Sequence, residues 1–102
     1  MDEIEIFWTK TAVRQRDSIF DYWNGRNKSK SYSKKLNLQI RSRIAIVKKN
    51  PEIGKRTDFL DSRVIFLGHY AIIYQLNLPE IIVIGFWDTR RDPEKLLALL
   101  KT

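Results

Sequence analysis

Three apolar segments joined by two short turns constrain the fold of this 102-residue chain most. Valine, isoleucine and aromatic residues make up most of each segment, which is typical of β-strands. The segments span residues 63–67, 70–76 and 81–87. Gly68-His69 predicts a tight hairpin turn, and Asn77–Glu80, which contains Pro79, predicts the next turn. The chain therefore predicts an antiparallel sheet, and its continuously apolar third strand is expected to be buried on both faces.

Two segments with apolar residues at helical spacing precede these strands. The first predicts a helix that Thr9 caps through its hydroxyl and that ends at Asn24-Gly25, because glycine readily adopts the left-handed conformation. The second predicts a helix that Ser31 or Ser33 caps and that stops at Asn50, because Pro51 disfavours helical geometry before it. Since the connection between them is short, we expect an antiparallel helical hairpin.

The two ends of the chain complete the predicted order of elements. Residues 3–8 begin with alternating polar and apolar side chains, which predicts a strand. Asp92-Pro93 is a typical helix start, and the leucines after it predict a short C-terminal helix packed on the sheet. We therefore expect one α+β domain over residues 1–102, in the order β-α-α-β-β-β-α. Its helical hairpin would pack on a mostly antiparallel four-stranded sheet.

The positive charge of the chain is concentrated in one segment. The formal net charge is +7, yet Asn24–Arg56 alone contains 11 Lys and Arg residues and a single acid, Glu52. A segment of this kind is either a solvated face or a surface for an anionic partner, such as nucleic acid or an acidic protein. The candidate binding residues from this segment are Arg41, Lys48, Lys55 and Arg56.

Composition excludes several classes of site. The chain has no cysteine, which excludes disulfides, thiolate metal sites and cysteine nucleophiles, and His69 is its only histidine. No apolar run approaches the roughly 20 residues that span a bilayer. Met1-Asp2-Glu3 is acidic where a signal peptide would be basic. We therefore expect a cytoplasmic protein that has no metal, no cofactor and no membrane partner.

Four short motifs lie in a characteristic order along nearly the whole chain. They are Trp8-Thr9 after the first strand, Asn50–Gly54 after the second helix, His69–Tyr74 on the central strand, and Asp88–Pro93 after the last strand. In this order they resemble the RelE/ParE superfamily of toxins from bacterial type II toxin–antitoxin systems. The resemblance implies a small, metal-independent toxin that arrests growth. It also implies a cognate antitoxin, whose C-terminal segment wraps around the toxin and neutralises it.

The superfamily has two branches with different targets. The RelE-like branch cleaves messenger RNA in the ribosomal A site, and the ParE-like branch inhibits DNA gyrase. RNA cleavage without metal requires a proton acceptor for the 2′-hydroxyl, cations for the phosphate and an acid for the leaving oxygen. The candidate catalytic residues for such a ribonuclease are Arg63, Tyr70, Arg90 and Arg91. His69 and Trp87 are further candidates for binding nucleic acid or a partner.

Several departures separate the chain from the RNA-cleaving branch. Ala71 stands where many relatives carry arginine, and the strand over residues 64–67 is apolar where ribonucleases of the family place a catalytic cation. Arg90-Arg91-Asp92 is typical of the ParE-like branch. The resemblance therefore favours inhibition of gyrase. Ribosome-dependent mRNA cleavage is the alternative, and a non-enzymatic nucleic-acid-binding module or an inactive toxin homologue is a further one.

Overall fold

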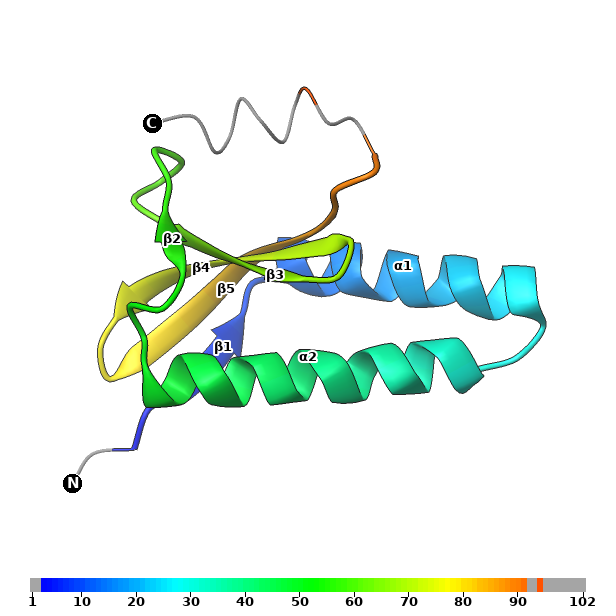
Figure 1. Cartoon of the computed structure of the whole chain (residues 1–102), viewed down its shortest axis with the longest axis horizontal. Helices are drawn as coiled ribbons and strands as arrows, with labels where there is room; N and C mark the ends of the chain where they lie inside the picture. Colours follow the sequence, from blue (N-terminus) through cyan, green and yellow to red (C-terminus); the bar gives the residue numbers. More distant parts are fainter. Residues whose placement is uncertain (1–2, 92–93, 95–102) are drawn as a thin grey trace.

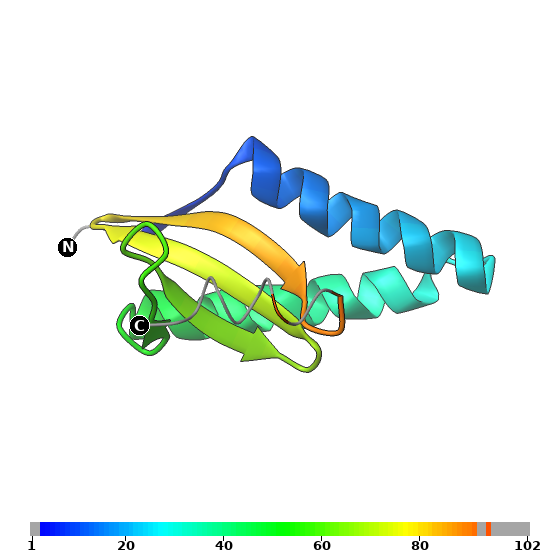
Figure 2. The same cartoon turned by 90° about the horizontal axis from the view of Figure 1, so that it is seen from above.

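A helical hairpin and a five-stranded sheet form the two layers of the computed structural model, which describes residues 3–91 and Glu94 (Figure 1). The elements are β1 (Glu5–Trp8), α1 (Lys10–Asn27), α2 (Ser31–Lys49), β2 (Lys55–Arg56), β3 (Arg63–Leu67), β4 (Tyr70–Asn77) and β5 (Glu80–Asp88). Both helices cover the same face of the sheet, and the connection between them projects beyond its edge (Figure 2). The predicted α+β architecture with its antiparallel hairpin is confirmed.

The sheet has the strand order β1-β5-β4-β3-β2, and only the β1–β5 pair is parallel. Gly68-His69 forms the predicted hairpin turn, since Leu67 pairs with Tyr70 across it. The face of β5 toward the helices is buried, whereas Ile82 and Ile84 on the other face are only half-buried. The predicted burial of β5 on both faces is therefore only partly right.

The strand Lys55–Arg56 was not expected, so the sheet has five strands where the sequence predicted four. This region was predicted to be a loop because two exposed basic residues carry no apolar alternation. Arg63 fixes the same region, since its guanidinium donates to the carbonyls of Glu52 and Gly54 at 3.1 and 2.9 Å. The predicted C-terminal helix lies outside the described residues, apart from Glu94.

The end of α1 and the start of α2 differ from the prediction. Helix α1 continues past Asn24-Gly25 to Asn27, and Lys28 caps its end in the left-handed conformation with a φ of 50°. Asn24 lies inside the helix, and its side chain accepts a hydrogen bond from Ser33 of α2 at 2.6 Å. That bond also occupies the Ser33 hydroxyl, and the N-cap of α2 is Lys30 without a side-chain cap. The predicted caps at Ser31 and Ser33 are therefore wrong, whereas Thr9 caps α1 as predicted.

Tyr74 anchors the segment between α2 and β2 to the core. Its hydroxyl accepts a hydrogen bond from the Gly54 N–H and donates one to the Pro51 carbonyl, both at 2.9 Å. Tyr74 is 1% exposed, so this hydroxyl has no access to alternative partners in water. Gly54 lies directly against the ring, which leaves no space there for a side chain.

We expect Gly54→Ala to lower the free energy of unfolding by about 1–3 kcal/mol, the usual cost of overpacking a core. A Cβ at this position would lie 2.5 Å from the Tyr74 hydroxyl oxygen and 2.8 Å from Cε1 of the ring. Urea unfolding followed by tryptophan fluorescence measures the change. Gly25→Ala is the matched control: a Cβ there meets nothing within 4 Å, so stability should rise slightly. Unchanged stability of Gly54→Ala would contradict this packing.

Candidate functional site

Several of the predicted site residues meet where β4 begins and β5 ends. Tyr70 pairs with Asp88 in the sheet, which brings the turn before β4 next to the segment after β5. The Thr89 N–H and hydroxyl both donate to the His69 carbonyl, at 2.7 and 2.8 Å. The indole N–H of Trp87 donates to the Arg91 carbonyl at 3.1 Å. His69, Tyr70, Trp87, Arg90 and Arg91 thus lie at one end of the sheet.

Tyr70 belongs to the core at this end. It is 3% exposed, and its ring stacks on Phe86 with the ring centres 5.3 Å apart. Its hydroxyl accepts a hydrogen bond from the Trp23 indole at 3.0 Å and lies 3.4 Å from the Tyr32 hydroxyl. Burial, with a further contribution from Tyr32, raises the pKa of Tyr70 to about 12. The phenol therefore remains protonated at neutral pH and is poorly suited to accept a proton from a substrate.

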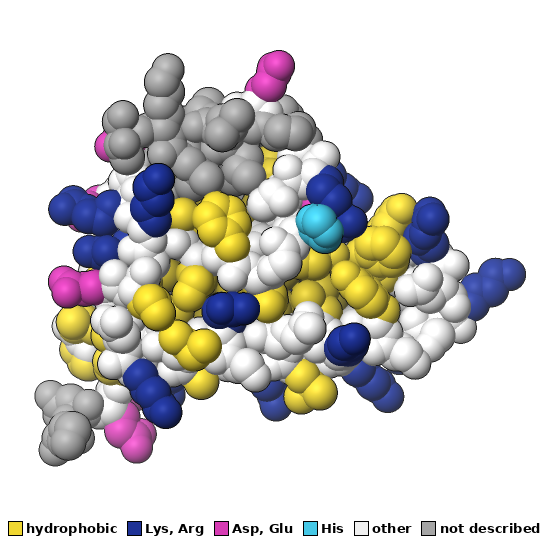
Figure 3. Space-filling view, in the orientation of Figure 1, with side chains coloured by type: hydrophobic (Ala, Val, Ile, Leu, Met, Phe, Trp, Pro, Cys, Tyr) yellow, Lys and Arg dark blue, Asp and Glu magenta, His cyan; other side chains and the backbone are white. Residues whose placement is uncertain are grey.

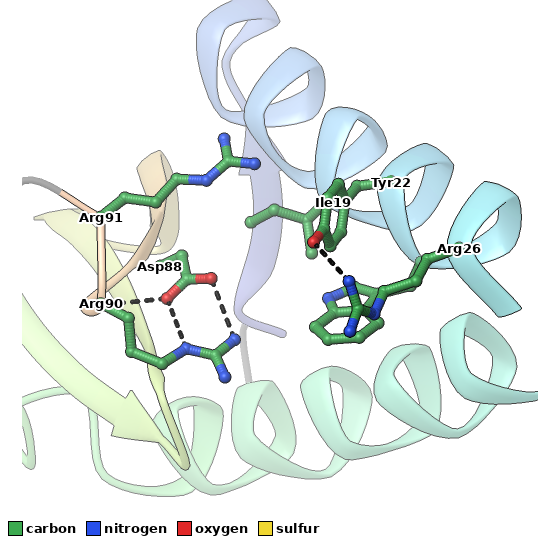
Figure 4. Close-up of a pocket in the computed structure, with 7 residues that line it drawn as sticks. Ile19, Tyr22, Arg26, Asp88, Arg90 and Arg91 are labelled. Carbon is green, nitrogen blue, oxygen red and sulfur yellow. Dashed lines mark hydrogen bonds and ion pairs between the residues drawn. The ribbon is translucent and has the colours of Figure 1, made fainter.

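Asp88 and Arg90 form a two-pronged ion pair (Figure 4). The Arg90 guanidinium carbon lies 6.0 Å from the centre of the Tyr70 ring. Nε and Nη2 of Arg90 donate to the two carboxylate oxygens at 3.1 and 3.0 Å, and the Arg90 N–H donates at 2.9 Å. Burial disfavours the charged carboxylate, but the hydrogen bonds from Arg90 outweigh it and hold the pKa of Asp88 below its ordinary value. The ion pair therefore fixes the direction of the chain as it leaves β5.

The lowered pKa of Asp88 predicts an acid-sensitive contribution to stability. This contribution is present above the pKa that Asp88 has in the unfolded chain and is lost as the pH falls through the lower pKa of the folded state. We expect Asp88→Asn to cost about 1–2 kcal/mol at pH 7 and less near pH 3, measured by urea unfolding at both pH values. Asp61→Asn is the control, because the Arg56–Asp61 pair is largely exposed and should contribute little. An equal cost of Asp88→Asn at both pH values would refute the prediction.

A groove follows α1 past this ion pair. It consists of two adjoining cavities of about 290 and 440 Å³ that share Ile19, Asp88 and Arg91. The first cavity is also lined by Tyr22, Trp23, Arg26 and Arg90, and the second by Arg14, Gln15, Ser18, Phe86 and Trp87. We call these two cavities together the α1 groove. Tyr22 and Arg26 were not predicted as site residues, although their spacing of four positions places them on one helix face.

A second groove lies between α2, α1 and β1. Two cavities of about 420 and 390 Å³ share Arg16, Asn37 and Arg41. Apolar side chains lining them include Ile6, Trp8, Ile40 and Ile44, and the basic side chains are Arg16, Lys34, Arg41 and Lys48. Lys34, Arg41 and Lys48 follow one another at intervals of seven, which places them on one face of α2. We call this surface the α2 groove. Figure 3 shows the other side of α2, where the helix runs beside β3 and basic and apolar side chains are also interleaved.

The remaining predicted residues lie elsewhere. Arg63 pairs with Tyr74, four positions along β4 from Tyr70, so it lies roughly 13 Å away along the strand. Lys55 and Arg56 are exposed on β2 at the far edge of the sheet. The candidate catalytic residues therefore separate into Arg63 beside the middle of β4 and Tyr70, Arg90 and Arg91 where β4 begins.

Two features are absent from the described part of the chain. No cluster of three or more His, Asp or Glu side chains within it is arranged to hold a metal ion. None of its helices is both long and apolar enough to cross a membrane.

Comparison with known proteins identifies the family. The family model of the ParE toxin of the type II toxin–antitoxin system parDE matches residues 6–93. The chain belongs to this family. The ParE-like fold agrees with a solved chain described as the chromosomal ParDE toxin–antitoxin system from P. aeruginosa, with a TM-score of 0.67 and 15% sequence identity. The similarity covers 82% of this chain and 94% of that chain. Among curated proteins no sequence matches.

Membership of the ParE family confirms the resemblance that the order of motifs indicated. It assigns the chain to the toxins of type II systems, whose ParE members are paired with an antitoxin. The α1 groove and the α2 groove are thus two separate concave surfaces on a ParE-family toxin.

Proposed function

We propose that this ParE-family toxin arrests growth by binding to DNA gyrase. The supporting observation is that the four residues that a ribonuclease of the superfamily would use do not form one accessible set, since Arg63 lies apart from the other three. Arg63 is held by the backbone carbonyls of Glu52 and Gly54 beside the middle of β4, and the Tyr70 hydroxyl is buried against Trp23. Arg90 is paired with Asp88. A binding surface needs no convergent catalytic set, so this arrangement suits inhibition by contact better than RNA cleavage.

We further propose that the cognate antitoxin binds the α2 groove. No acidic side chain is among the residues that line its two cavities, whereas four basic ones are. Lys34 and Lys48 are fourteen residues apart on α2, or about 21 Å at the helical rise. An amphipathic acidic segment of three to four helical turns would match both this length and this charge.

Purified gyrase and relaxed plasmid provide the direct test. We expect the toxin to inhibit supercoiling, or to accumulate cleaved gyrase–DNA complexes, and to lose this effect when its antitoxin is added first. Translated messages should remain intact, as judged by primer extension after induction of the toxin. Cleaved messages together with unaffected gyrase would contradict the proposal and favour the ribosome-dependent nuclease.

Tyr70→Phe adds a variant that separates the two mechanisms. The substitution retains the ring that stacks on Phe86 and removes only the hydroxyl. A toxin that acts by binding gyrase should keep most of its activity, provided that circular dichroism shows the variant to be folded. A ribonuclease that uses this phenol should lose its activity by a factor of a hundred or more, the usual contribution of one acid–base group.

A further inference from the structure

Guanidinium groups and aromatic rings alternate in the α1 groove (Figure 4). The Arg91 guanidinium carbon is 5.8 Å from the centre of the Tyr22 ring, and that of Arg26 is 5.9 Å from the Trp23 ring. Nη1 of Arg26 also lies 3.5 Å from the Tyr22 hydroxyl. Tyr22 is 47% exposed, a large fraction for an aromatic ring with a cation on either side. The groove therefore presents an accessible ring between two arginines.

The positive charge of the α1 groove is not neutralised by the acidic side chains that line it. Asp88 is the only acid among the lining residues of the described chain, and Arg90 neutralises it through the ion pair. Arg14, Arg26 and Arg91 form no ion pair with any residue in the described part of the chain. Three arginines are thus available to an anionic ligand.

The arginines are distributed along the length of α1. Arg14 lines the second cavity, Arg26 lines the first, and Arg91 lines both. Arg14 and Arg26 are twelve residues apart, which is about 18 Å along a helix. Spaced positive charges of this kind suit a ligand with repeated anionic groups better than a single small anion.

We propose that the α1 groove binds single-stranded DNA. This inference rests on the proposed function, since a toxin bound to gyrase lies beside the DNA that gyrase holds. Phosphates would pair with Arg14, Arg26 and Arg91, whose planar forks match phosphate oxygens, and one base would stack on Tyr22. A base paired within a duplex cannot reach this ring, so the strand must be single. An acidic peptide would use the arginines but would not require the ring.

Fluorescence anisotropy with a labelled 12-nucleotide oligothymidylate tests the proposal on the purified toxin. We expect Tyr22→Ala to weaken binding roughly 5- to 150-fold, the range for loss of one stacked base, and Tyr22→Phe to bind like the wild type. Arg91→Ala should reduce the slope of log K against log salt by about 0.7, the value for one phosphate contact on a single strand. Arg43→Ala, which removes the same charge from a cavity between α2 and β3, is the matched control and should leave the slope unchanged.

Each alternative ligand or surface has its own outcome. Equal binding by the wild type, Tyr22→Ala and Arg91→Ala would overturn the proposal. So would weaker binding by Arg41→Ala/Lys48→Ala alone, which would place the strand in the α2 groove. Tighter binding of oligouridylate than of oligothymidylate would identify the ligand as RNA. An acidic peptide that displaces the oligonucleotide, and whose own binding Tyr22→Ala does not weaken, would identify the ligand as a peptide.

Two results separate this inference from the proposed function. Inhibition of gyrase without any binding of the oligonucleotide would overturn the α1 groove as a DNA site and leave gyrase as the target. Binding that depends on Tyr22 and Arg91 without any effect on gyrase would support the groove and contradict the proposed target.

Discussion

Reversing the charge of Arg41 and Lys48 together is expected to prevent neutralisation by the antitoxin while the toxin remains active. Both side chains line the α2 groove beside apolar residues such as Ile40 and Ile44. In Arg41→Glu/Lys48→Glu, two attractive contacts with an acidic segment become repulsive, and like charges across an interface cost several kcal/mol. We expect the Kd for the antitoxin to rise by a factor of about a hundred or more.

Isothermal titration calorimetry with the purified antitoxin measures this change, and survival of cells that express both proteins reports its consequence. Arg43→Glu/Lys49→Glu is the matched control, because it makes the same change of charge on the same helix at positions that do not line the α2 groove. The α2 groove is not the docking surface if both double variants bind the antitoxin equally well. Loss of gyrase inhibition by the first variant alone would instead assign this groove to the target.

The arrangement of elements followed from local signals that the structure confirms. The two-residue turn at Gly68-His69 and the Thr9 cap are formed as predicted, because turn chemistry and capping depend on a few neighbouring residues. The end of α1 was mispredicted for the opposite reason. Lys28, not Gly25, adopts the left-handed conformation at the helix end, and Asn24 inside the helix contacts Ser33 of the other helix, a contact that no local pattern encodes.

The orientation of side chains near the end of β5 could not be predicted from the alternation of residues along the strand either. The pairing shifts between Ile73 and Tyr74, so Tyr74 faces Val83 while Ile73 faces Gly85. This bulge places Phe86 in the core cluster with Val83, although strict alternation would have placed the two on opposite faces.

The candidate site was predicted residue by residue but not as a surface. Arg90 and Arg91 were predicted from the motif after the last strand. The residues of α1 that line the other side of the α1 groove were not predicted. Trp23 lies on the apolar stripe of α1 and therefore looked like an ordinary core residue. Grooves between a helix and a strand end depend on long-range packing, which the spacing of residues along one element does not reveal.

Phe86→Ala is expected to cause the largest loss of stability, about 3–5 kcal/mol, the usual cost of truncating a buried phenylalanine to alanine. Phe86 is 1% exposed, stacks on Tyr70 and lies with its ring centre 6.4 Å from that of Trp8. Its backbone N–H donates to the side-chain oxygen of Gln15 in α1 at 2.8 Å. This hydrogen bond joins β5 to α1 beyond the point where the pairing of β5 with β1 ends. Because domains are stable by only about 5–15 kcal/mol, this loss is a large part of the total.

Urea unfolding followed by tryptophan fluorescence measures the loss, and Phe86→Leu provides a variant that should still fold if Phe86→Ala does not. Phe66→Ala is the matched control, since Phe66 is 46% exposed on β3 and its truncation should cost much less. Phe86 also lines the α1 groove, so the folded Phe86→Leu variant should weaken oligonucleotide binding through the shape of the groove while leaving its arginines in place. If Phe86→Ala is as stable as Phe66→Ala, the packing of β5 against α1 is not what holds this end of the sheet together.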